Sequence, residues 1–191
     1  VLHARRSLWL ACGYVFSALF ALVHGLTFPD AFVSGSLFGG LQTTAWLWIV
    51  WHGAWPVFVI AYALDGAGLK TDGRPSVSDS WHLHRIAYPM TLVAVAVVPL
   101  PPVAFRSALP ELLASGYERP PATRWIGAAV WTVHLAALLV LIARTRLHRL
   151  LDLWLCVSLV AVMIELALSG MMVTARYQVG FYIGRVDGVV A

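Results

Sequence analysis

Charged residues are scarce in this chain. Of its 191 residues, 12% are Asp, Glu, Lys or Arg, whereas 60% are hydrophobic. A soluble domain usually carries about 25% charged residues, so this composition argues against a soluble fold. Mean hydropathy is +0.80, and several apolar runs reach about 20 residues, the length that a helix needs to cross a bilayer. These runs do not alternate as transmembrane β-strands do. The sequence predicts an all-α, polytopic transmembrane helical bundle.

Other signals are also missing. The two cysteines, Cys12 and Cys156, lie inside apolar runs, which predicts buried thiols. The sequence contains no glycine-rich phosphate loop and no GxSxG elbow, which are signatures of common soluble enzymes. Its 13 basic residues form no long basic patch. We therefore expect no enzyme in this chain and no nucleic-acid partner, and the lipid bilayer becomes its first expected partner.

Five complete spans are expected, at residues 7–28, 41–64, 86–105, 124–143 and 151–173. The third is interrupted by Pro-Leu-Pro-Pro at 99–102. A sixth begins near Gly180 and stops after about 12 residues, too few to cross a bilayer. We interpret residues 1–191 as a single integral-membrane domain that is part of something longer.

The lysine and arginine counts of the loops predict the orientation of the bundle, because cytoplasmic loops carry more of both. Alternating spans put eight basic residues on one side: Arg5, Arg6, Lys70, Arg74, Arg85, Arg144, Arg146 and Arg149. The other side receives five: Arg106, Arg119, Arg124, Arg176 and Arg185. This bias places the N-terminus in the cytoplasm, with loops 27–40 and 106–123 outside. Loop 27–40 contains three phenylalanines and is either a lid in the outer interface or an ordinary connector.

Four ionisable residues lie within the expected spans: His24, His52, His134 and Glu165. With a rise of about 1.5 Å per residue, all four fall in the outer half of the membrane or near its midplane. A membrane protein tolerates such groups where they face the bundle interior and find partners. We therefore expect these side chains to point away from lipid.

Tryptophans accompany this polar set at helical spacing. Trp48 and Trp55 share a face with His52, and Trp131 lies three residues before His134. In the fifth span, a mostly small and polar stripe starting at Trp154 contains Glu165. Small residues and hydroxyls on one face are typical of helix–helix interfaces in membranes.

Several interpretations of the polar set stay open. The side chains could fix helix packing, line a pocket for an unknown small ligand, or take part in proton-coupled transport. Alternatively, His52 and His134 lie at similar depths on separate helices and could bind the iron of a b-type haem, as in a membrane electron carrier. No other cofactor or metal site is expected.

Four stretches resemble a known family: HGLTFPDAF (24–32), LQTTAWLWIVWHGAWPVFVIAYAL (41–64), LDLWLCVSLVAVMIELALS (151–169) and ARYQVGFYIGRV (175–186). They are similar to the MASE4 domain, a bacterial membrane-associated sensor found ahead of GGDEF diguanylate cyclases and some histidine kinases. The resemblance covers nearly the whole chain. The family domain has about eight spans, so this chain corresponds to its third span onward, and Asp187 stands where an apolar or aromatic residue is more usual.

This resemblance implies a sensory input domain in the bacterial inner membrane, acting in cyclic di-GMP signalling through a C-terminal effector of the full-length parent. A homodimer stays open. The family's characteristic residues fall on His24, Pro29, Gln42, His52, Pro56, Asp152, Trp154, Glu165, Arg176, Tyr182, Gly184 and Arg185. The candidate ligand-binding set is therefore His24, Trp48, His52, Trp55, Trp131, His134, Glu165, Arg176, Tyr182 and Arg185. Pro56 and the 99–102 segment are expected to be helix breaks that permit two packings.

Overall fold

The computed structural model describes residues 2–65, 77–105, 107–114 and 120–172, which form helices joined by loops. The elements are α1 (Leu2–Leu26), α2 (Leu41–Asp65), α3 (Val77–Val97), α4 (Leu100–Ala104), α5 (Pro121–Thr145), α6 (Leu150–Glu165) and the π-helix η2 (Leu166–Met172). Within the described residues, five helical segments are long and apolar enough to cross a membrane. The predicted all-α, multi-pass membrane fold is confirmed.

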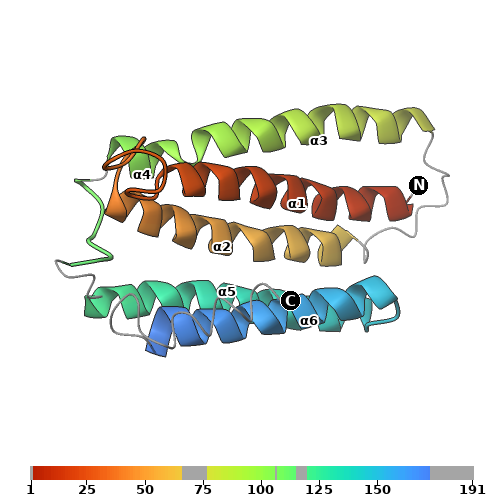
Figure 1. Ribbon diagram of the computed structural model, residues 1–191. Coiled ribbons are helices and arrows are strands. Elements are labelled where there is room, and N and C mark those ends of the chain that lie inside the picture. The colour runs from red at the N-terminus through yellow and green to blue at the C-terminus, as the bar shows by residue number, and fades with distance from the viewer. Residues whose placement is uncertain (1, 66–76, 106, 115–119, 173–191) are drawn as a thin grey trace.

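The helices lie side by side in a row (Figure 1). Helix α1 packs against both α3 and α2, α2 packs against α5, and α5 packs against α6 and η2. We call the end of the bundle where α1 and α6 begin the Arg6 end. The opposite end, where α1 finishes and α2 begins, is called the Thr27 end.

Two apolar clusters hold the row together. Near the Arg6 end, Leu10 of α1, Val59 of α2 and Leu141 of α5 meet Leu159 of α6. Farther along, Phe16 and Phe20 of α1 pack against Leu47 of α2. Close packing of this kind replaces the hydrophobic effect as the force between helices in lipid.

The helix ends differ from the expected boundaries. Helices α1 and α3 begin several residues earlier, in polar sequence, because a helix continues beyond the apolar core wherever nothing breaks it. The expected interruption at 99–102 is confirmed, since α3 ends at Val97 and α4 starts after Pro99. The expected break at Pro56 is wrong: α2 continues as one helix from Leu41 to Asp65, because neighbouring helices can accommodate a proline within a membrane helix. The change from α-helix to π-helix after Glu165 was not predicted. The expected sixth span falls outside the described residues.

Hydrogen bonds from the start of α2 organise the Thr27 end. The Gln42 amide donates to the carbonyl of Leu113, and its oxygen accepts from the Leu112 amide at 2.9 Å. The Thr43 hydroxyl donates to the carbonyl of Pro102 at 3.0 Å. The Thr44 hydroxyl donates to the carbonyl of Thr27 at 2.7 Å, which ties the end of α1 to α2.

Candidate functional site

The first half of the predicted polar set gathers between α1 and α2. His24 is buried at the end of α1, with its ring 6.0 Å from the ring of Trp51 on α2. The Trp51 ring lies 5.0 Å from His52, whose ring is 4.2 Å from that of Trp48. Trp51, whose depth in the second span makes it a pocket candidate, links His24 to His52. We call His24, Trp48, Trp51 and His52 the α1–α2 aromatic group.

The second half gathers on α5, α6 and η2. His134 of α5 is fully buried, and the Trp131 indole on the same helix donates to the carbonyl of Met163 at 3.1 Å. Glu165 ends α6 and is 7% exposed. The Ser169 hydroxyl donates to the backbone carbonyl of Glu165 at 2.7 Å. Trp131, His134, Glu165 and Ser169 form what we call the α5–α6 polar group.

The two groups lie on neighbouring helices, because α2 packs directly against α5. The described contacts place His24 and His52 in one group and His134 and Glu165 in the other. The expected inward orientation agrees with the burial of His24, His134 and Glu165, whereas His52 is half-buried. Trp55 belongs to neither: its ring lies 4.9 Å from that of Tyr14, at the α1–α2 interface. Arg176, Tyr182 and Arg185 fall outside the described residues.

Both mid-helix histidines are oriented by their own helix. The Nδ1 atom of His52 is 2.8 Å from the carbonyl oxygen of Trp48, and that of His134 is 3.0 Å from the carbonyl oxygen of Val130. A carbonyl oxygen can only accept, so Nδ1 carries the proton, and in the neutral ring Nε2 is the acceptor. Among the described residues, the buried Nε2 of His134 has no hydrogen-bond partner.

The winding of the chain changes on the helix that packs against α5. Helix α6 ends at Glu165 and continues as the π-helix η2, which packs against α5. π-helical segments are rare and are frequently found at functional sites. A buried acceptor and an unusual helix thus meet on the same pair of helices.

A third constellation, at the Arg6 end, was missed as a site. The Tyr62 hydroxyl of α2 donates to Asp152 Oδ1 of α6 at 2.5 Å, and each residue is 1% exposed. Arg6 of α1 donates from Nε to the carbonyl of Tyr62 at 3.2 Å, and its guanidinium lies 4.3 Å from the centre of the Tyr62 ring. This Arg6–Tyr62–Asp152 network connects three helices. The available signal was an aspartate within an apolar span, which is costly unless paired.

Metal binding has little support in this part of the molecule. Across the ranges that the structure describes, no three His, Cys, Asp or Glu side chains are grouped so that they could hold a metal ion.

Comparison with known proteins completes the description of the site. No curated protein and no solved structure matches the chain. The sequence profile of MASE4, described as a membrane-associated sensor, integral membrane domain, matches residues 3–191. With its buried polar groups and membrane-spanning helices, the chain belongs to the MASE4 family of membrane-associated sensor domains.

Proposed function

We propose that this domain is the sensory input unit of a bacterial signalling protein. It responds to a stimulus on the periplasmic side or within the membrane, and it controls a cytoplasmic effector such as a diguanylate cyclase in the full-length parent. The Arg6 end faces the cytoplasm of the inner-membrane protein, as the eight-to-five distribution of basic residues favours.

One observation carries the proposal: among the described residues, the buried Nε2 atom of His134 has no hydrogen-bond partner, and its helix α5 packs against the π-helix η2. A buried acceptor without a partner destabilises the state that contains it by about 1–3 kcal/mol. A stimulus that donates a hydrogen bond or a proton to this nitrogen relieves that penalty. Such a stimulus therefore has different affinities for the two packings of the domain, and this difference allows it to shift their populations.

The π-helix is the element with two arrangements. Its hydrogen bonds run from residue i to i+5, and conversion to an α-helix shortens them to i+4. The conversion changes the direction in which the chain leaves Met172. The residues that follow would carry this change to the effector.

The replacement His134→Asn tests the proposal, because the asparagine amide can still donate to the Val130 carbonyl but offers no counterpart of Nε2. Since 1.4 kcal/mol corresponds to a factor of ten and the penalty is about 1–3 kcal/mol, we expect basal effector output to change about tenfold. The measurement is cellular cyclic di-GMP in a full-length parent that carries a cyclase. The matched control is His148→Asn at an exposed position beyond α5. Equal output from both variants would refute the role of His134.

We propose a b-type haem carrier as the alternative function. Its support is that His52 and His134 both turn Nδ1 to a backbone carbonyl, which leaves Nε2 as the lone-pair nitrogen that an axial ligand requires. If this alternative holds, protein purified with haem available shows a Soret band that disappears in His52→Ala and in His134→Ala. Colourless protein from the same preparation eliminates it.

A further inference from the structure

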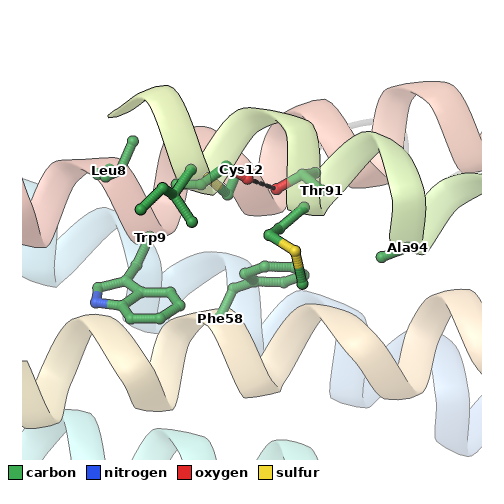
Figure 2. A pocket seen from close by; sticks show the side chains of 9 residues that line it. Leu8, Trp9, Cys12, Phe58, Thr91 and Ala94 are labelled. Carbon is green, nitrogen blue, oxygen red and sulfur yellow. Dashed lines mark hydrogen bonds between the residues drawn. The ribbon is translucent and has the colours of Figure 1, made fainter. Parts of the chain in front are cut away.

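An apolar groove runs between α1, α2 and α3 (Figure 2). Its volume is about 380 Å³. Leu8 and Cys12 of α1 line it with Phe58 of α2, and Ala87, Met90 and Ala94 of α3 complete the wall. Ligand pockets in proteins typically measure about 300–1,000 Å³, so the space suits a small or slender ligand.

The polar atoms in the lining already have partners. The Thr91 hydroxyl donates to the carbonyl of Ala87 at 2.9 Å, within the same helix. The Trp9 indole donates to Asp65 Oδ2 at 3.2 Å. Because these donors are satisfied and the remaining wall is carbon and sulfur, the groove favours an apolar occupant over water or a polar ligand.

The groove opens towards the side of the bundle. Ile86 and Met90, on its α3 wall, are 64% and 61% exposed. Both belong to the membrane-spanning segment His84–Ala104, of which only 17% is buried inside the protein. The surrounding phase at this depth is therefore hydrocarbon, and Met90 has the flexible side chain that adapts to an irregular apolar partner.

The charges at the groove's Arg6 end select the kind of lipid. Arg85 is exposed and immediately precedes Ile86, while half-buried Arg6 lies one turn before Trp9. Asp65 is the acidic group facing this end, where it accepts from Trp9. Arg6 is engaged with Tyr62 in the Arg6–Tyr62–Asp152 network, so the exposed Arg85 supplies the guanidinium for a phosphate, which it matches in shape and charge.

We propose that this groove binds one acyl chain of an anionic phospholipid, with the phosphate of its headgroup held by Arg85. The acyl chain fills the space between Phe58 on α2 and Met90 on α3. The bound lipid thereby completes the packing of α3, whose extensive contact in the described bundle is with α1.

Photocrosslinking in nanodiscs tests the site. The 191-residue chain is placed in phosphatidylcholine–phosphatidylglycerol discs that contain trace phosphatidylglycerol with a diazirine on its acyl chain. A parallel preparation carries the diazirine on phosphatidylcholine. We expect adducts on the peptides that contain Met90 and Cys12, at least fivefold more abundant with the phosphatidylglycerol probe.

Two variants distinguish binding of the acyl chain from binding of the headgroup. Ala87→Phe fills the groove and should abolish the adducts with both probes, whereas Arg85→Gln should keep the adducts but remove the preference for phosphatidylglycerol. The matched controls are Val157→Phe on the exposed face of α6 and Arg144→Gln at the same end of the bundle. Thermal unfolding of each variant confirms that it is folded.

Three results would overturn the proposal. Equal labelling by the two probes in the wild-type chain removes the anionic selectivity. Labelling that survives Ala87→Phe places the lipid outside the groove. A dimer that dissociates in Ala87→Phe, without lipid adducts in the wild type, assigns the groove to a second copy of the chain.

Discussion

Replacing Asp152 with alanine should lower the free energy of unfolding by about 1.5–3 kcal/mol, the range for a hydrogen bond to a charged group. The carboxylate is 1% exposed and accepts from Tyr62 at 2.5 Å. The positive charges of Arg6 and Arg149 also act on the Tyr62 hydroxyl. Without Asp152, the buried Tyr62 hydroxyl loses its acceptor. Reversible unfolding in detergent mixtures measures the loss.

Tyr62→Phe removes only the donor and should destabilise the protein by about 1.5–3 kcal/mol, as expected for a hydrogen bond to a charged group. Tyr14→Phe is its matched control, because Tyr14 is 57% exposed and a surface change usually stays within about 0.5 kcal/mol. In a double-mutant cycle, the coupling between positions 62 and 152 should be large. Additive effects of the two substitutions would contradict the network.

Gly13→Leu should produce the second large effect. A Cβ atom at Gly13 would lie 3.0 Å from Cβ of Phe58 and 3.2 Å from Cζ3 of Trp55. The Phe58 Cβ is attached to the backbone and cannot swing away, so α1 and α2 must separate. Overpacking of this kind costs about 1–3 kcal/mol, and we expect the upper part of that range for leucine. The midpoint of thermal unfolding reports it.

Gly53→Leu is the matched control on α2. A Cβ atom there meets nothing within 4 Å, so the added side chain has space. We expect its unfolding midpoint to stay close to that of the wild type. Leucine has a higher helix propensity than glycine, so equal destabilisation by both substitutions would mean that the bulk of leucine, and not the α1–α2 contact at Gly13, determines the effect.

Much of the fold follows from the sequence because the length and hydropathy of each span are local properties. The stripe of α2 illustrates this. Of the six residues expected on one inward face, Thr44, Val59 and Tyr62 are buried, whereas Trp48, His52 and Trp55 are half-buried. The stripe of α6 was partly wrong. Trp154 was expected inside but is 60% exposed, while Leu155 and Leu159 form the core. In a membrane helix, the lipid-facing and protein-facing sides are both apolar, so hydrophobic periodicity discriminates between them poorly.

The burial of the candidate residues was more predictable than their contacts. Burial of His134 and Glu165 follows from the high cost of exposing such groups to lipid. The pairing of Tyr62 with Asp152 does not, because these residues are 90 positions apart and their meeting depends on how three helices pack. The π-helix was equally unpredictable from the sequence, because its residues, LALSGMM, contain no proline that would indicate a break in an α-helix.

The bonds at the two ends of the α1–α2 pair limit how these helices can move. Arg6 holds α2 at one end, and Thr27 accepts from Thr44 at the other. A piston stroke of one helical turn, about 5.4 Å, would rupture both bonds at once. Rotation of the helices about their long axes disturbs these end contacts far less. We therefore expect a signal to pass between α1 and α2 as a rotation of the helices and not as sliding. Disulfide mapping of α1 against α2 should then reveal changes in facing angle without a change in register.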